Sequence, residues 1–108
     1  MERPELTVAV QRSPTEAVVS LTGEIDLSTA PRLSTVVTEL LSDPSDPPAR
    51  VVLDMAGVTF CDSQGLGTLV VLSRKASLAH SCLVLTNVAD FLLRVLDITG
   101  LRPALMIS

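Results

Sequence analysis

The sequence predicts an α/β fold in which helices pack on a mixed sheet of four to five β-strands. Two β-patterned stretches near the N-terminus are separated by a short turn at Ser13-Pro14, so we expect them to pair as an antiparallel hairpin. After them, short apolar runs alternate with stretches of helical periodicity, which favours parallel strands joined by right-handed crossovers. Because the chain has 108 residues, we expect residues 1–108 to form a single domain with its own core.

The hairpin is predicted from apolar residues that recur at every second position. Leu6, Val8 and Val10 are each followed by a polar or small residue, a period typical of a strand with one buried face. Residues 18–21 form the second strand beyond the turn, and we expect Gly23 to end it.

The first helix is predicted to begin after Ser28, which can serve as its N-cap. Pro31 then falls in the first turn, where a missing amide costs little. Apolar residues follow at the spacing of a single helical stripe, namely Leu33, Val36, Val37, Leu40 and Leu41. Three prolines in residues 42–50 indicate that the helix gives way to a loop.

The middle of the chain predicts a central strand followed by a second helix. Residues 51–53 are apolar without alternation, which is typical of a strand buried on both faces, and we expect residues 54–59 to form the loop that leaves it. Either Asp62 or Ser63 is expected to cap the helix, which continues to about Ala79. Its inward side is expected to carry Leu66, Leu69, Val70 and Ala76.

The last third of the chain repeats the alternation of strand and helix. Residues 82–86 are predicted to form another buried strand, and residues 89–96 a third helix that Gly100 stops. Its inward-facing residues are expected to be Phe91, Leu92, Val95 and Leu96. Residues 105–107 are expected to add a final edge strand.

Composition and charge favour a protein as the binding partner. The formal net charge is -4, and Trp and Tyr are absent, so the chain lacks the cations and rings that direct nucleic-acid binding needs. The longest apolar run, residues 69–72, is too short to span a membrane, and no targeting segment is evident. We expect a cytoplasmic protein in which Cys61 and Cys82 are buried, reduced thiols, without a metal or other cofactor.

Asp62-Ser63-Gln64-Gly65 interrupts the apolar pattern at the start of the second helix. Ser63 has two interpretations there: an N-cap whose hydroxyl accepts a hydrogen bond from the amide of Gly65 or Leu66, or a phosphate acceptor at a helix end that tolerates negative charge. Glycine within a helix costs roughly 0.5–1 kcal/mol relative to alanine. Gly65 and Gly67 therefore suggest that another protein's active site needs to approach the backbone.

Enzymatic interpretations of Ser63 have less support. His80 is the only histidine, and it lies about 25 Å along the same helix, too far to act as a base for Ser63. The glycine-serine-glycine elbow of hydrolases is missing, and no Gly-Lys-Ser/Thr phosphate loop follows. We therefore predict no catalytic residue.

Three stretches of the chain resemble segments of a known family. Residues 52–76 (VLDMAGVTFCDSQGLGTLVVLSRKA) contain a strand, a loop and Asp-Ser-x-Gly-Leu-Gly at the start of a helix. Residues 21–33 (LTGEIDLSTAPRL) carry Gly-Glu-Ile-Asp before the first helix, and residues 93–101 (LRVLDITGL) end a late helix with Thr-Gly-Leu. In this order and over nearly its whole length, the chain resembles the anti-sigma factor antagonists, small bacterial proteins that consist of a STAS domain.

The resemblance implies a switch by phosphorylation. In that family the unphosphorylated antagonist binds an anti-sigma factor, a serine kinase with a histidine-kinase-like ATP-binding fold, and thereby frees the sigma factor. The kinase phosphorylates the serine after the aspartate, here Ser63, and the complex dissociates until a metal-dependent serine phosphatase resets it. Many relatives have a second hydroxyl residue after this serine, where the present chain has Gln64, so Ser63 is the only acceptor in the motif.

The resemblance also implies a partner-binding surface around that serine. Asp26 matches an acid that contacts the kinase in the family, although an acid favoured by the neighbouring helix dipole explains it as well. Ser28 and Thr29 are expected at the edge of the interface, although capping accounts for Ser28. The residues expected to bind the partner are Asp26, Ser28, Thr29, Asp62, Ser63, Gln64, Gly65, Leu66 and Gly67.

Two other functions stay open at this point. A STAS module with a scaffold or accessory role in a transport or stress-signalling assembly would have the same fold, since fold alone does not determine function. A nucleotide or other small anion would be attracted by the free amides at a helix start, although no lysine is adjacent and few polar groups converge there.

Overall fold

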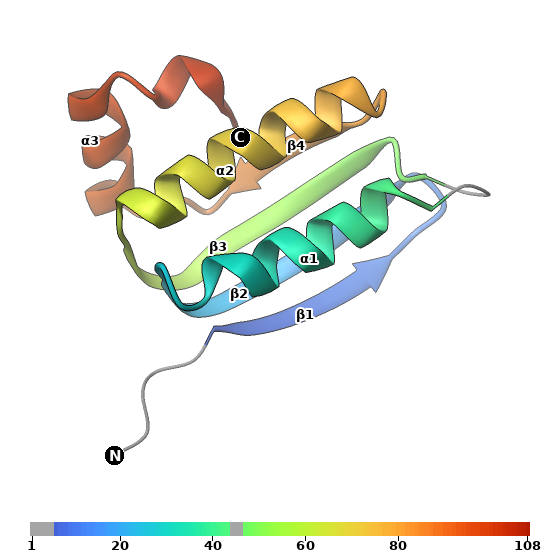
Figure 1. Cartoon of the computed structure of the whole chain (residues 1–108), viewed down its shortest axis with the longest axis horizontal. Helices are drawn as coiled ribbons and strands as arrows, with labels where there is room; N and C mark the ends of the chain where they lie inside the picture. The colour runs from blue at the N-terminus through green and yellow to red at the C-terminus, as the bar shows by residue number, and fades with distance from the viewer. Residues whose placement is uncertain (1–5, 44–46) are drawn as a thin grey trace.

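The computed structural model describes residues 6–43 and 47–108, which form a five-stranded sheet of order β1-β2-β3-β4-β5 (Figure 1). The elements in chain order are β1 (Thr7–Arg12), β2 (Glu16–Ile25), α1 (Ala30–Leu41), β3 (Arg50–Cys61), α2 (Ser63–Leu78), β4 (Cys82–Thr86), α3 (Asp90–Thr99), the 3-10 helix η1 (Arg102–Ala104) and β5 (Met106–Ile107). β1 and β2 form an antiparallel hairpin, and all later pairings are parallel. The predicted mixed α/β sheet with its N-terminal hairpin is confirmed.

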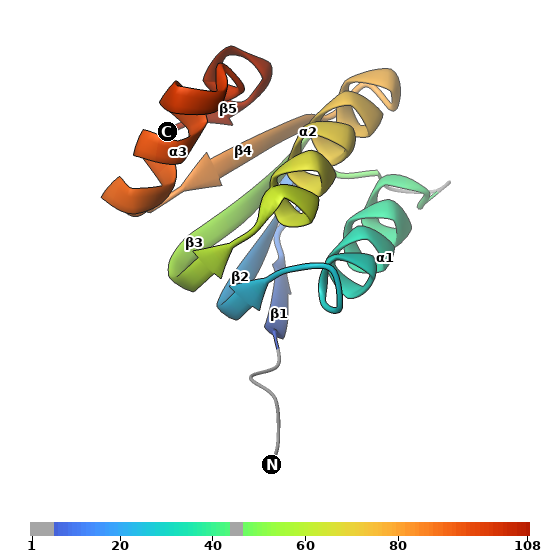
Figure 2. The ribbon, with the colours of Figure 1, turned by 60° about the vertical axis from the view of Figure 1, so that its left-hand side comes forward.

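The helices α1 and α2 lie side by side over the sheet, and α3 lies beyond α2 near β4 and the C-terminus (Figures 1 and 2). The core forms where the inward-facing side chains of the strands meet these helices. Leu53 of β3, Leu69 of α2 and Leu85 of β4 are completely buried within it. Burial of one such side chain contributes roughly 1.5–3 kcal/mol, so these contacts hold α2 firmly on the sheet.

β3 is much longer than its sequence pattern indicated. The expectation of a loop at residues 54–59 is wrong, as is the expectation that β2 ends at Gly23. The two strands remain paired in parallel as far as Ile25 and Cys61. Residues 54–59 show no regular alternation of apolar and polar side chains, so their pattern does not indicate a strand. What makes them a strand is the backbone ladder to β2, whose hydrogen bonds do not depend on side-chain alternation.

Gly57 permits the close approach of β3 to β2 at an irregular part of this ladder. The register shifts twice, once between Ser20 and Thr22 and again between Gly23 and Glu24. A Cβ atom at Gly57 would lie 2.6 Å from the Thr22 hydroxyl oxygen, so a larger residue would push the strands apart. The long β3 therefore runs directly to Asp62, and α2 begins at the next residue.

α1 has the predicted apolar stripe but not the predicted cap. Leu33 and Val37 are buried, and the other stripe residues pack against the core. Ser28 lies outside the helix, and Thr29 occupies the N-cap position without a side-chain capping bond. The Thr29 hydroxyl is engaged elsewhere, since it donates to the Glu24 carbonyl at 2.8 Å.

α2 follows the predicted bounds closely, whereas α3 is longer than predicted. Leu66, Leu69 and Ala76 are buried as expected and Val70 is partly buried, while the burial of Leu72 was not anticipated. α3 ends where Gly100 adopts a left-handed conformation with φ of 73°, as the glycine predicted.

The expectation that Phe91 faces inward is wrong, since 38% of it is exposed. Leu92 and Leu96 are the buried residues of α3, and Val95 packs partly against the core. Leu92 and Leu96 are four residues apart and define the inward side of the helix, so Phe91 lies on its flank.

The two cysteines differ in burial. Cys61 is buried as expected, but Cys82 is only partly buried, because the strand beside it, β5, is just two residues long.

No helix in residues 6–43 and 47–108 is long and apolar enough to cross a membrane. The expectation that the N-terminus carries no targeting segment falls largely on residues 1–5, which lie outside the described ranges.

Candidate functional site

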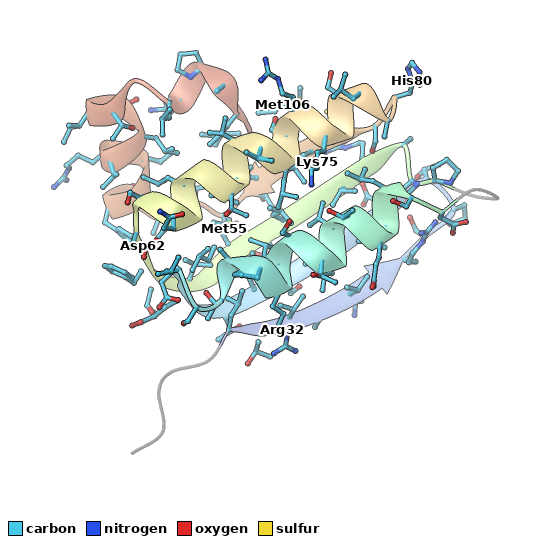
Figure 3. All side chains as sticks on the ribbon, viewed as in Figure 1. Arg32, Met55, Asp62, Lys75, His80 and Met106 are labelled. Atoms are coloured by element: carbon cyan, nitrogen blue, oxygen red, sulfur yellow. The ribbon has the colours of Figure 1, made fainter. Side chains whose placement is uncertain are left out.

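Asp62 connects the start of α2 to the loop between β2 and α1. Its Oδ1 atom accepts a hydrogen bond from the Gly65 amide at 2.8 Å, and its Oδ2 atom accepts one from the Leu27 amide at 3.2 Å. Its own amide donates to the Ile25 carbonyl at 3.1 Å. A single residue thus holds together two segments that are far apart in the chain, and Figure 3 shows it at one end of α2.

Asp62, and not Ser63, is the N-cap of α2. An N-cap residue has non-helical dihedral angles, as Asp62 has with φ of −87° and ψ of −175°. Ser63 is already the first helical residue, so the expectation that its hydroxyl accepts from the amide of Gly65 or Leu66 is wrong. Its side chain is exposed, and no hydrogen bond of its hydroxyl group occurs within the described residues.

The two glycines of the motif have different roles. Gly65 is buried, and a Cβ atom there would lie 2.6 Å from the Ile25 carbonyl oxygen and 2.7 Å from the Cys61 sulfur. Gly65 is therefore needed for the first turn of α2 to contact the ends of β2 and β3, not for access from outside. Gly67 is exposed, and a Cβ atom there would have nothing within 4 Å.

Leu66 also lies beneath the site. Its side chain is 5% exposed and belongs to the core, so Leu66 and Gly65 support the surface from below. The expected partner-binding residues that α2 presents to solvent are Ser63, Gln64 and Gly67.

The loop between β2 and α1 is closed by the Asp26 carboxylate. Its Oδ1 atom accepts from the Ser28 hydroxyl at 2.7 Å and from the amides of Ser28 and Thr29 at 2.9 and 3.1 Å. The bond from the Ser28 hydroxyl is the main cause that lowers the pKa of Asp26, and the two amides act in the same direction. Asp26 and Ser28 thus shape the loop that the Leu27 amide fastens to Asp62.

Two exposed apolar side chains beside the site were not anticipated from the sequence. Leu27 is 70% exposed in the loop, and Phe60 is 47% exposed near the end of β3. A cavity of about 250 Å³ lies next to Leu27 between α1 and α2, and Gln64 contributes to its wall. The exposure of Leu27 could have been inferred from the sequence, because Leu27 is an apolar residue in a polar loop and belongs to no helical stripe. Phe60 directly follows residues 54–59, which were expected to form a loop, so no strand pattern indicated its position.

Two carboxylates, those of Asp26 and Asp62, lie at the site and each accepts backbone amide hydrogen bonds. Burial raises the pKa of the Cys61 thiol to about 12, and the neighbouring Asp62 carboxylate adds to this effect, so Cys61 stays a neutral thiol.

His80 lies at the opposite end of α2 from Asp62 (Figure 3). In the ranges that the structure describes, no group of three or more His, Cys, Asp or Glu side chains is placed to hold a metal ion.

Nearly the whole chain is similar to proteins of a known family. Residues 8–107 match the family described as Mlab, STAS domain. The chain is 31% identical over 103 residues to an anti-sigma-B factor antagonist of Bacillus subtilis (strain 168), a match that covers 95% of this chain and 91% of that protein.

Solved structures have the same arrangement of strands and helices. An anti-sigma factor antagonist from Mycobacterium paratuberculosis superimposes with a TM-score of 0.80 at 27% identity, over 95% of this chain and 85% of the other. The anti-sigma factor antagonist SpoIIAA in its unphosphorylated form superimposes with a TM-score of 0.74 at 18% identity, over 94% of this chain and 88% of the other.

Proposed function

The chain belongs to the STAS domain family, and on this basis we propose that it acts as an anti-sigma factor antagonist in the cytoplasm. In its unphosphorylated form it binds an anti-sigma factor that is a serine kinase, and this binding releases a sigma factor. Phosphorylation of Ser63 by that kinase ends the interaction, and a serine phosphatase restores it. The resemblance noted in the sequence is confirmed for the family; the kinase, the phosphatase and the role of Ser63 are our proposal.

The position of Ser63 is the observation that carries this proposal. Its side chain is exposed at the first position of α2, and its hydroxyl makes no hydrogen bond to any residue that the structure describes, because Asp62 caps the helix. Because Asp62 already caps the helix, a phosphate on Ser63 would displace no hydrogen bond within the described residues, and we expect phosphorylation to leave the fold intact.

The added charge explains how one phosphate would end an interaction. A phosphate brings about -1.5 to -2 charges, and the positive end of the α2 dipole tolerates them within the free protein. Asp62 directly precedes Ser63, and its carboxylate accepts from the Leu27 amide, which holds the loop that carries Asp26 next to the start of α2. Repulsion and desolvation of a few kcal/mol within an interface would lower the affinity by orders of magnitude without refolding the protein.

The surface around Ser63 has the composition expected of a protein interface. Leu27 and Phe60 offer apolar side chains to a partner, and the exposed Gly67 leaves the α2 backbone open to close approach. We propose that the partner surface consists of these three residues together with Asp26, Ser28, Ser63 and Gln64. Thr29, Asp62, Gly65 and Leu66 hold that surface in place from beneath or from within the loop.

The decisive experiment is intact-mass spectrometry of the protein after incubation with ATP and a candidate anti-sigma serine kinase from the same genome. We expect the mass of one phosphate to be added to the wild type and none to the Ser63→Ala variant. A phosphate that remains in Ser63→Ala would contradict the assignment of the acceptor. Absence of phosphate with every candidate kinase would favour the scaffold role instead.

A further inference from the structure

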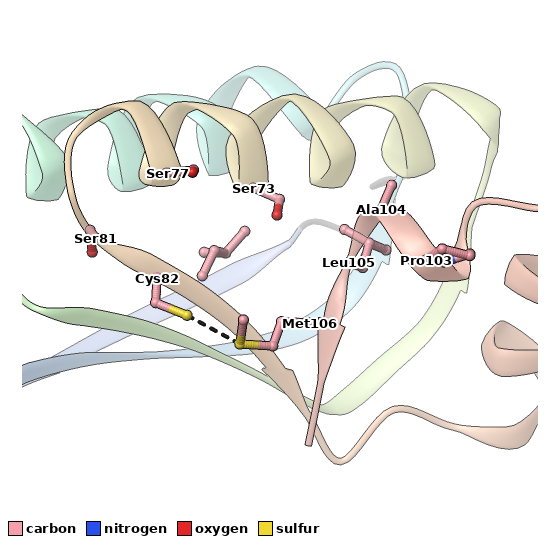
Figure 4. Close-up of a pocket in the computed structure, with 9 residues that line it drawn as sticks. Ser73, Ser77, Ser81, Cys82, Pro103, Ala104, Leu105 and Met106 are labelled. Carbon is pink, nitrogen blue, oxygen red and sulfur yellow. Dashed lines mark hydrogen bonds between the residues drawn. The ribbon is translucent and has the colours of Figure 1, made fainter.

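The sulfur atoms of Cys82 and Met106 lie in contact on adjacent strands. The distance from the Cys82 Sγ atom to the Met106 Sδ atom is 3.1 Å, with the thiol as donor (Figure 4). Met106 of β5 is paired with Val84 of β4, two residues after Cys82. Because alternate residues of a strand share a face, both side chains lie on the face opposite to Leu83 and Leu85 of the core.

This pair is accessible, unlike the other described cysteine and methionine. Cys82 is partly buried and Met106 is 53% exposed, and Figure 4 shows their sulfur atoms on the side of β4 that faces away from α2. By contrast, Cys61 is 9% exposed and Met55 only 1%, so an oxidant in solution reaches the Cys82–Met106 pair first.

We propose that Cys82 and Met106 form a peroxide-reactive pair. A peroxide oxidises Cys82 first, and the oxidised Cys82 side chain then oxidises Met106. The Cys82 thiolate attacks one oxygen of a peroxide, the O–O bond breaks, and Cys82 becomes a sulfenic acid while the other oxygen leaves as an alcohol or as water. The contact between the sulfur atoms then decides the next step, because the Met106 thioether is already beside the oxidised sulfur.

The second step transfers the oxidation between the two side chains. The Met106 Sδ atom attacks the Cys82 Sγ atom, an S–S bond forms, and hydroxide leaves, which gives a sulfonium at Met106. Water then attacks that sulfonium sulfur, the S–S bond breaks with its electron pair on Cys82, and two protons are released. Cys82 returns to the thiolate and Met106 becomes the sulfoxide, whose oxygen comes from water and not from the peroxide.

The pair would thus protect Cys82 from irreversible oxidation. A sulfenic acid left alone proceeds to sulfinic acid under further peroxide, whereas methionine sulfoxide is reduced by dedicated enzymes. The product also places a polar sulfoxide on β5, a two-residue strand that is held at the sheet edge by the ladder to β4 and by the Ser108 amide on the Leu85 carbonyl.

The origin of the sulfoxide oxygen provides the test. The wild-type protein is treated with hydrogen peroxide in water enriched in oxygen-18, and the peptide that contains Met106 is analysed by mass spectrometry. We expect the sulfoxide of Met106 to carry the heavy isotope from water. In Cys82→Ser, Met106 is oxidised directly and more slowly, and its sulfoxide carries the light oxygen of the peroxide. Met55 serves as an internal control that stays unoxidised.

Two results would overturn the proposal. One is a wild-type Met106 sulfoxide that carries the peroxide oxygen, which would show direct oxidation. The other is sulfinic acid at Cys82 with Met106 unoxidised, which would show that no transfer takes place. As a further check, Met106→Leu is expected to accumulate a sulfenic acid at Cys82 that a dimedone-type reagent traps, and absence of that adduct would remove the first step.

Discussion

The Leu27 amide donates a hydrogen bond to the Asp62 carboxylate at 3.2 Å, across a sequence separation of 35 residues. This bond joins the loop after β2 to the start of α2, where Ser63 lies exposed. The proposed partner surface exists only because these two segments meet. Some residues of this region build the surface from within, and others are exposed where a partner would contact them.

Asp62→Ala is expected to destabilise the protein, and Ser63→Ala is not. Asp62 satisfies the Gly65 amide at the helix start as well as the Leu27 amide, and loss of an N-cap typically costs about 0.5–2 kcal/mol. Ser63→Ala should stay within about 0.5 kcal/mol of the wild type. The free energy of unfolding in urea measures both. Equal losses in the two variants would show that Ser63 takes part in capping.

Gly65→Ala and Gly67→Ala are expected to change stability in opposite directions. A Cβ atom at Gly65 would lie 2.6 Å from the Ile25 carbonyl oxygen, so crowding should cost roughly 1–3 kcal/mol. A Cβ atom at Gly67 meets nothing within 4 Å. Alanine there should gain roughly 0.5–1 kcal/mol from helix propensity. Thermal unfolding of both variants tests this, and a tolerated Gly65→Ala would refute the packing role.

Ser63→Asp is expected to weaken kinase binding while leaving the fold as stable as before or slightly more so. An acid in the first turn of a helix interacts favourably with the helix dipole, by about 0.3–1 kcal/mol. Within the interface the same charge is repelled. Calorimetric titration with the kinase and thermal unfolding should therefore move in opposite directions. Ser77→Asp, near the other end of α2, is the control and should leave binding unchanged, whereas equal binding by wild type and Ser63→Asp would disprove the switch.

Leu27→Ser and Phe60→Ser are each expected to weaken kinase binding about tenfold or more, which corresponds to roughly 1.4 kcal/mol. Both side chains are already exposed, at 70% and 47%, so the free energy of unfolding should change little. Leu78→Ser is the matched control, because Leu78 is 77% exposed at the far end of α2. If Leu78→Ser reduced affinity as much as Leu27→Ser, the loss would not be specific to the proposed surface.

Asn87→Gly is expected to raise the pKa of Asp54. The Asn87 side-chain amide donates to the Asp54 carboxylate at 3.0 Å, and this bond, with a smaller contribution from the Ala56 amide, lowers the pKa of Asp54 in the folded protein. A carboxyl group whose folded pKa is depressed adds stability above its unfolded pKa and loses that contribution as pH falls through the folded pKa.

This pH dependence can be followed by NMR titration of the Asp54 carboxyl carbon. Glycine accepts the left-handed backbone of Asn87, φ of 56°, so the variant removes the side chain without backbone strain. Stability should fall less steeply on the acid side in Asn87→Gly than in the wild type. Asp26, whose pKa is lowered by Ser28, should titrate identically in both proteins. An unchanged Asp54 titration would remove Asn87 as the cause.

Local patterns in the sequence were sufficient for most elements of this fold. The stripe that begins at Leu33 predicted α1, Gly100 predicted the end of α3, and the alternation of strands and helices predicted a mixed sheet. These features depend on residues within one or two turns of each other, so a single stretch contains the information that determines them.

The motif around Ser63 was recognisable from its residues, and the family that it indicated is confirmed. How the motif is built was decided only by contacts between distant parts of the chain. The extension of β3 to Cys61 depends on its ladder to β2, and the need for glycine at position 65 depends on the Ile25 carbonyl. Neither partner is visible in the local pattern.

The sequence by itself therefore determined the order of the elements and the family, and its motif drew attention to Ser63. Only the tertiary structure decided that Asp62 is the N-cap of α2, so that the Ser63 hydroxyl is not used for capping. It also decided that the sulfur atoms of Cys82 and Met106 are in contact. The physical reason is the same in each case. A hydrogen bond or a sulfur contact depends on which atoms meet in space, and strand pairing brings together residues that the sequence keeps far apart.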